Sequence, residues 1–186
     1  RSAIRDIQKK SGITTVYVTH DQSEALAVSD RIAIMNKGII MQTGTPLDVY
    51  RHPENLFAAT FIGESNVLEC TLKNSDSIQL NGSEYSFELN RIANDKTDSS
   101  SIKLSVRPDE FEFSDSGIKG TVIERTFLGT SYEYVIEIEN KQRVKVSAKS
   151  SLPPKDNGEN VFLSFDKTLV NAFDSISENS IMNDVK

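Results

Sequence analysis

VYVTHDQSEALAVSDRIAIMNKG, residues 16–38, decides the fold of the first part of the chain. An apolar run leads into His20, a segment with an acidic start follows, and a second apolar run closes the stretch. Asp21 and Glu24 have the spacing of a helix-capping pair, in which the first carboxylate accepts backbone N–H bonds and the second reaches back. The stretch therefore predicts strand, helix and strand in that order, with His20 where the first strand ends.

The alternation of helix and strand extends upstream of this stretch. Residues 1–12 place Ile4 and Ile7 on one helical face and end at Gly12, which suits the left-handed position after a helix. The run ITTVYV at 13–18 is rich in β-branched residues and lacks polar alternation. That composition is typical of a strand covered on both faces in a parallel sheet.

The same alternation continues downstream. RIAIMNKG and IIMQTG, residues 31–44, predict two strands joined at a Lys37-Gly38 turn. Pro46 begins a short predicted helix, and ENLFAATFIG at 54–63 predicts another. We interpret residues 1–64 as an α/β unit.

From about residue 65 the period of the apolar residues changes to two. The short alternating runs are VLECTL, SIQL, YSFEL, IKLSV, GTVIERTFLG, YEYVIEIE, RVKVSA and NVFLSF. This pattern predicts an all-β domain over residues 65–174, a small antiparallel barrel or sandwich that folds independently. The polar stretch 90–101 is expected to be a flexible loop that divides the β half into two sub-barrels, and residues 175–186 a flexible tail.

Composition narrows the classes of partner. The 186 residues carry a formal net charge of −6, which argues against nucleic acid and against an anionic membrane surface. Cys70 is the only cysteine, so an intrachain disulfide and a Cys-rich zinc site are excluded. No apolar run approaches the roughly 18 residues of a membrane span, so we expect no direct membrane insertion.

Two long motifs resemble a known family. Residues 14–63 are closely similar to the end of the nucleotide-binding subunit of ABC importers, in the subgroup that takes up maltose, polyamines, ferric iron or sulfate. LSVRPDEFEF at 104–113 and GTVIERTFLGTSYEYVIEI at 120–138 resemble, more loosely, the TOBE domain of the same subgroup, a regulatory domain built on an OB-like barrel. The resemblance implies an α/β fragment, the end of the nucleotide-binding domain, over residues 1–64, and an all-β OB-like TOBE domain over 65–174.

The resemblance also implies a role for His20. In that family the sequence T-H-D-Q-x-E-A is the switch (H) loop, and its histidine contacts the γ-phosphate and helps hold the attacking water. An imidazole at the carboxyl end of a parallel strand can donate an N–H to a transferring phosphoryl group. The family further implies ATP and Mg as cofactors of the full-length subunit, a homodimer of ATPase subunits, membrane permease partners, and a cytoplasmic location at the inner face of the cell membrane.

The other motifs of the family are missing from the sequence. It contains no G-x-x-x-x-G-K-[ST] P-loop, no LSGGQ-type signature, no glutamine loop and no apolar strand ending in Asp-Glu. In the family all four precede the position that matches Arg1. We therefore expect a C-terminal fragment that binds no cofactor or metal alone and hydrolyses no ATP. Residues 124–138 favour ferric iron slightly over a polyamine as the solute.

Other chemically active side chains have simpler interpretations. His52 is expected to be an exposed loop residue rather than a metal ligand. Cys70 alternates with leucines and is expected in the core. Asp109, Glu110 and Glu112 alternate with phenylalanines and are interpreted as a solvated strand face rather than an acid–base cluster.

Two alternative functions remain open. The β domain could be a stand-alone small-ligand or oxyanion-binding regulatory module, since relatives of the domain in molybdate systems bind their anion. It could also be an OB-type nucleic-acid binder, because Tyr132, Tyr134, Ile136 and Ile138 share one strand face on which bases could stack. The neighbouring glutamates would repel phosphates, so packing is the expected role of this face.

The apolar strand 13–18 carries a further expectation. In a complete nucleotide-binding domain it would lie beside the P-loop strand and the magnesium-binding strand, and an unpaired apolar edge pairs readily with another chain. We expect the first half to be disordered or to self-associate. The expected dimer contact comprises Ile13, Val16, Val18 and the helix that bears Ile4 and Ile7.

Overall fold

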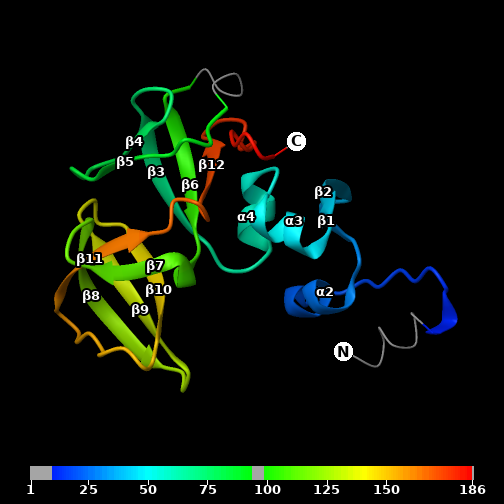
Figure 1. The fold of residues 1–186 in the computed structure, drawn as a ribbon, viewed down its shortest axis with the longest axis horizontal. Coiled ribbons are helices and arrows are strands. Elements are labelled where there is room, and N and C mark those ends of the chain that lie inside the picture. Colours follow the sequence, from blue (N-terminus) through cyan, green and yellow to red (C-terminus); the bar gives the residue numbers. More distant parts are fainter. Residues whose placement is uncertain (1–9, 94–98, 186) are drawn as a thin grey trace.

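The structure, a computed structural model, describes residues 10–93 and 99–185. Within these ranges the molecule is mostly antiparallel β-sheet with a few short helices (Figure 1). We call residues 20–63 the helical part and residues 66–185 the sheet part. No helix in the described ranges is long and apolar enough to cross a membrane.

Helix α2, Gln22–Val28, begins where the capping signal predicts. Asp21 Oδ1 accepts the backbone N–H of Glu24 at 2.9 Å. The second carboxylate does something else: Glu24 Oε2 accepts the hydroxyl of Tyr17 at 3.0 Å and that of Thr19 at 3.2 Å. The backbone N–H of Asp21 donates to Thr19 Oγ1 at 2.9 Å. The predicted helix start is confirmed, while Glu24 holds the preceding segment.

The predicted hairpin follows α2. Strands β1, Ile32–Asn36, and β2, Ile39–Gly44, pair antiparallel. Lys37 and Gly38 form the connection with φ values of 47° and 83°. Positive φ at both central residues is the geometry of a type I′ turn, whose twist matches that of the flanking strands.

The helices α3, Pro46–Arg51, and α4, Leu56–Phe61, are confirmed. Thr45 and Asp48 form a reciprocal capping box at the start of α3, and Asn55 caps α4. These short helices are stabilised by packing rather than by length. Their small core, shared with the hairpin, consists of Ile32, Ile34, Val49, Ala58 and Ile62.

The strand predicted at residues 13–18 is wrong for this structure. The segment has no regular secondary structure and extends away from the helices (Figure 1). Val16 and Val18 are 87% and 90% exposed. A β-branched run becomes a strand only when a neighbour accepts its hydrogen bonds, and no strand in the described part of the chain pairs with it. The helix predicted over 1–12 lies mostly outside the described residues, although Gly12 has the expected φ of 64°.

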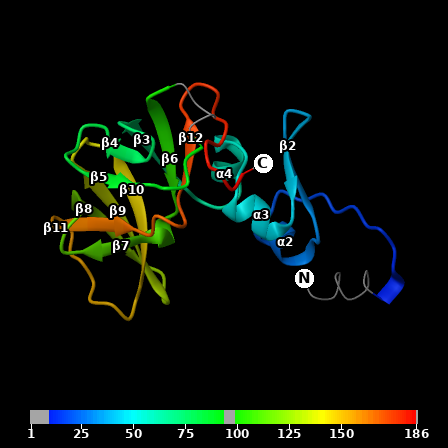
Figure 2. The ribbon, with the colours of Figure 1, turned by 45° about the horizontal axis from the view of Figure 1, so that its top comes forward.

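The sheet part contains two antiparallel sheets (Figure 2). The first has the order β12-β6-β3-β4-β5. Its strands are β3 (Asn66–Leu72), β4 (Ser77–Leu80), β5 (Ser86–Glu88), β6 (Ser101–Val106) and β12 (Asn171–Asp174). Because β6 pairs with β3 across the stretch 90–101, that stretch does not divide two sub-barrels. Ile92 and Ala93 within it are buried, and residues 94–98 lie outside the described ranges.

The second sheet has the order β10-β9-β8-β11-β7. Its strands are β7 (Phe111–Ser114), β8 (Ile118–Phe127), β9 (Ser131–Ile138), β10 (Arg143–Lys149) and β11 (Asn160–Phe165). A short 3₁₀ helix, η1 (Pro108–Glu110), connects β6 to β7. One hydrophobic cluster includes Leu104 of the first sheet with Ile136 and Leu163 of the second, so both sheets share a core.

The end of the chain differs from the frayed tail that the sequence suggests. Ile181 and Met182 are fully buried and belong to the same core cluster. Met182 forms a β-bridge with Ile92, and Asn179 forms one with Asn55 just before α4. This segment packs between the helical part and the first sheet. Its sequence suggests a flexible tail because polar residues flank the buried apolar ones.

Candidate functional site

His20 is exposed and lies in the bend immediately before α2. The local sequence fixes this bend, because Thr19, Asp21 and Glu24 form hydrogen bonds with one another around it. The Thr19 hydroxyl donates to Glu24 Oε2 and accepts the backbone N–H of Asp21, and Asp21 Oδ1 accepts the backbone N–H of Glu24. His20 follows residues 13–19, but the prediction that it ends a strand is wrong here, because that segment has no regular secondary structure.

Among the residues that the structure describes, no group of three or more His, Cys, Asp or Glu is placed to hold a metal ion. The sequence also lacks a phosphate-cradling loop. The phosphate contact of His20 therefore stays a prediction.

The segment after His20 is attached to the loop that follows α4. The side-chain oxygen Oε1 of Gln22 accepts the backbone N–H of Gly63 at 2.7 Å. Gly63 has a φ of 79°, in the left-handed region. A Cβ atom at this position would lie 2.6 Å from Nη1 of Arg107, so the backbone here passes directly against that guanidinium group.

Arg107 joins the sheet part to helices α3 and α4. Its side chain is buried, with the residue 6% exposed. Nη1 donates to the carbonyl of Ile62 at 2.8 Å, and Nη2 donates to the carbonyl of Tyr50 at 2.9 Å. The guanidinium carbon lies 3.7 Å from the centroid of the Tyr50 ring, a cation–π contact. Burial lowers the pKa of Arg107, while the neighbouring Tyr50 and Glu110 raise it.

The prediction that Glu110 lies on a solvated strand face is wrong. It lies in η1, is buried, and accepts the backbone N–H of Arg107 at 2.8 Å through Oε2. Its Oε1 accepts a hydrogen bond from Arg51 of α3 at 3.4 Å. Burial raises the pKa of Glu110 despite these donors. Asp109 and Glu112 are exposed, as predicted.

Neither Arg107 nor Gly63 was predicted from the sequence as a functional residue. A signal was present in Arg-Pro-Asp-Glu, since proline after an extended residue and a carboxylate three residues on are the marks of a capped turn. The glycine after the apolar helix at 54–63 was visible too. The contact between Gly63 and Arg107 could not be predicted from the sequence, because the two positions are 44 residues apart.

The other residues singled out from the sequence are His52, Cys70 and the apolar face of β9. Nδ1 of His52, at the end of α3, lies 3.3 Å from Oδ2 of Asp184, and the His52 side chain is 40% exposed, so His52 is a partly exposed residue. Cys70 is fully buried, and burial raises its pKa to about 12. The predicted packing face on β9 is confirmed by burial of Tyr134, Ile136 and Ile138, with Tyr132 half-buried.

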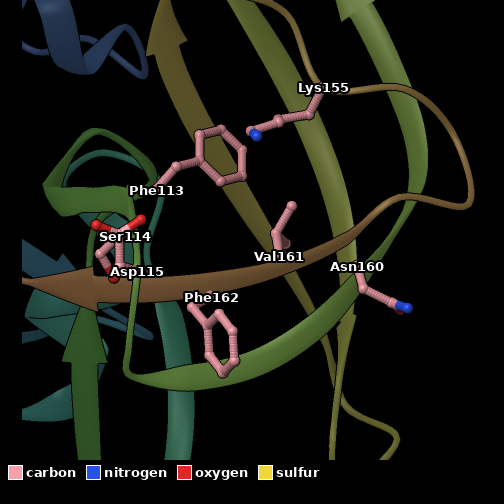
Figure 3. Close-up of a pocket in the computed structure, with 7 residues that line it drawn as sticks. All are labelled: Phe113, Ser114, Asp115, Lys155, Asn160, Val161 and Phe162. Carbon is pink, nitrogen blue, oxygen red and sulfur yellow. The ribbon is translucent and has the colours of Figure 1, made fainter.

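A cleft of about 370 Å³ lies between β7 and β11 (Figure 3). Its lining residues are Phe113, Ser114, Asp115, Lys155, Asn160, Val161 and Phe162. Of these only Lys155 is cationic, and its Nζ pairs with Glu159 Oε1 at 2.8 Å. Asp115 adds a carboxylate to the same lining. The charges of this cleft do not favour an oxyanion.

Comparisons with known proteins agree with the sequence resemblance. Residues 104–173 match the family model of the TOBE domain. The chain is 39% identical over 192 residues to the Fe(3+) ions import ATP-binding protein FbpC of Fusobacterium nucleatum, covering 100% of this chain and 50% of that protein. It is 37% identical over 154 residues to the spermidine/putrescine import ATP-binding protein PotA of Borreliella afzelii, covering 78% of this chain and 42% of that protein.

A solved structure of the cytoplasmic molybdate-binding protein ModG with molybdate bound aligns over 57% of this chain and 94% of its own. The TM-score of 0.45 and identity of 12% are too low to bear on function. The chain spans about half the length of the curated relatives that it matches. With its TOBE domain, and with similarity to these import ATP-binding proteins over 100% and 78% of its own length, the chain belongs to the family of ATP-binding subunits of ABC importers.

Proposed function

We propose that this chain is the switch-loop and regulatory portion of the ATP-hydrolysing subunit of an ABC importer. The observation that carries the proposal is the presence, in one chain and in this order, of the THDQSEA motif around an exposed His20 and a TOBE domain. The similarity to import ATP-binding proteins over the whole chain supports it.

In this proposal residues 1–64 are the end of the nucleotide-binding domain and residues 65–174 are the TOBE domain. The exposed apolar segment 13–18 then belongs to the parallel sheet of the complete domain, with neighbours that come from outside this chain. The exposure of Val16 and Val18 supports this assignment, because side chains of this kind are otherwise costly to leave in water. The tail after 174 packs as part of the sheet part.

His20 is proposed to contact the γ-phosphate of ATP in the complete subunit. An exposed imidazole at the start of a helix, on a bend fixed by its neighbours, is suited to present an N–H to an anionic group. In the family, ATP and magnesium are held by motifs that this sequence lacks, and the chain alone is expected to hydrolyse no ATP.

The partners are proposed from the family. They are a second ATPase subunit and the membrane permease, which places the subunit at the cytoplasmic face of the membrane; nucleic acid is not expected. Ferric iron is the proposed solute ahead of a polyamine, since the relative named for Fe(3+) import matches all of this chain, whereas the Borreliella relative named for spermidine/putrescine import matches 78% of it.

ATP turnover of the complete subunit with its permease tests the proposal. His20→Ala should lower turnover about a hundredfold or more, the range seen when a transition-state donor is removed. His52→Ala is the matched control, because its imidazole faces Asp184 instead, and should leave turnover near that of the wild type. Wild-type turnover in His20→Ala would refute the assignment.

A further inference from the structure

Arg107 is the point at which one side chain of the sheet part bonds to helix α3 and to the end of helix α4. It follows directly after β6, and its two terminal nitrogens reach the carbonyls of Tyr50 in α3 and Ile62 at the end of α4. Carbonyls in the last turn of a helix have no partner within the helix, and a cation is favoured there. The guanidinium group thus fixes the ends of α3 and α4 to the end of β6.

The placement of Arg107 is itself held from two sides. Glu110 accepts the backbone N–H of Arg107 and also receives Arg51 from α3. The ring of Tyr50 covers one face of the guanidinium. A movement of β6 relative to α3 therefore disturbs several charge-assisted contacts together rather than one alone.

Gly63 lies between the Arg107 guanidinium group and helix α2 and contacts both. The guanidinium lies so close to Gly63 that a side chain at that position would collide with it. The N–H of Gly63 in turn donates to Gln22 at 2.7 Å. Helix α2 has no fully buried residue, and its Ala25 and Leu26 are only partly buried against the small core. A polar contact therefore matters more for its position than it would for a buried helix.

We propose that Arg107 is a positioning residue that couples the end of β6 to helix α2 through Gly63 and Gln22. A shift of the sheet part is transmitted to the start of α2, two residues from His20. The consequence for ATP hydrolysis rests on the proposed function; the coupling itself does not.

Amide hydrogen exchange on this chain tests the coupling. In Arg107→Met the amides of Gly63, Ala25 and Ser29 should exchange about tenfold faster, as expected when a hydrogen bond to a charged group is lost, while amides of β6 and β12 keep their rates. A purely structural defect would instead accelerate all elements together. Gln22→Ala should accelerate the amides of α2 to a similar extent.

The double variant gives the decisive comparison. Because both side chains act through Gly63, Arg107→Met combined with Gln22→Ala should accelerate exchange in α2 no more than either change alone. If the increases in exchange rate of the two single variants multiply in the double variant, the proposal is overturned. It is also overturned if the amides of α2 exchange at wild-type rates in Arg107→Met. Arg125→Met is the control, since Arg125 bonds to Lys155 and Asp156 elsewhere, and it should leave α2 unaffected.

Arg107→Lys covers the case in which Arg107→Met does not fold. Lysine keeps the charge but lacks the planar fork that bonds two carbonyls at once, so exchange in α2 should rise here too. Wild-type rates in this variant would refute the coupling. None of these measurements involves nucleotide, so a failure here leaves the assignment of His20 standing, and a failure of that assignment leaves the coupling standing.

Discussion

Glu110 illustrates how surroundings set the behaviour of a single carboxylate. Burial raises its pKa above the ordinary 4.5, and the bond from the Arg107 N–H and the charges of Arg107 and Arg51 only partly oppose this. The folded state therefore binds a proton more readily at Glu110 than the unfolded state does. The stability that protonated Glu110 contributes is complete at pH values below its pKa in the unfolded state. It is lost as the pH rises through its higher pKa in the folded state.

Replacing Glu110 by Gln removes this titration. We expect the free energy of unfolding of the wild type, minus that of Glu110→Gln, to fall as pH rises above 4.5 and then to level off. Urea denaturation over a pH series measures it. Glu112→Gln, at an exposed position, is the control. A difference that grows with pH would mean that the arginines outweigh burial.

Single residues were predictable from sequence when their signal was local and regular. Cys70 and Tyr134 were assigned to the core by strict alternation along strands, and both are buried. Glu110 also fitted an alternating pattern, but Pro108 starts a 3₁₀ turn there and rotates the carboxylate inward. Arg107 had no periodic signal, since its partners lie in two other elements.

At the scale of elements, the helices and the hairpin were predictable because their determinants lie within a few residues. Thr45 and Asp48 cap α3 reciprocally, and the Lys37-Gly38 turn sets the register of β1 and β2. The run 13–18 has equally strong β propensity, yet a strand also needs a neighbour, and propensity does not supply one. The expected fold of an ATPase domain's end therefore stays a proposal for that segment.

The buried end of the chain gives an element-scale prediction. Ile181→Ala should destabilise the protein by about 2–5 kcal/mol, because it empties a fully packed site. Ile176→Ala is the matched control five residues earlier, where the side chain is 85% exposed, and should be nearly neutral. Thermal or urea unfolding distinguishes them. Equal effects would show that this segment is not packed in solution.

At the scale of the whole molecule, large apolar side chains are exposed along the segment before α2. Ile13, Val16 and Val18 are 63%, 87% and 90% exposed on backbone that pairs with no described strand. Such a segment favours pairing with a second copy or with a missing neighbour. The shared core of the two sheets, by contrast, closes without any help from this segment.

We therefore expect the chain to self-associate through this segment. Val16→Asp together with Val18→Asp should weaken association at least about tenfold, since each buried valine contributes roughly 1.5 kcal/mol or more. Light scattering over a concentration series measures it. Ile176→Asp, an equally exposed apolar position elsewhere, should change nothing. A wild type that stays monomeric at all concentrations would contradict the expected dimer.

The burial of Cys70 has a practical consequence for observing motion in this molecule. Thiol reagents attack the thiolate, and a pKa of about 12 leaves almost none at neutral pH. Dyes introduced on added surface cysteines, for instance Ala27→Cys on α2 and Glu88→Cys on β5, would then label only those positions. The distance between α2 and β5 can therefore be followed by fluorescence without first removing the native cysteine.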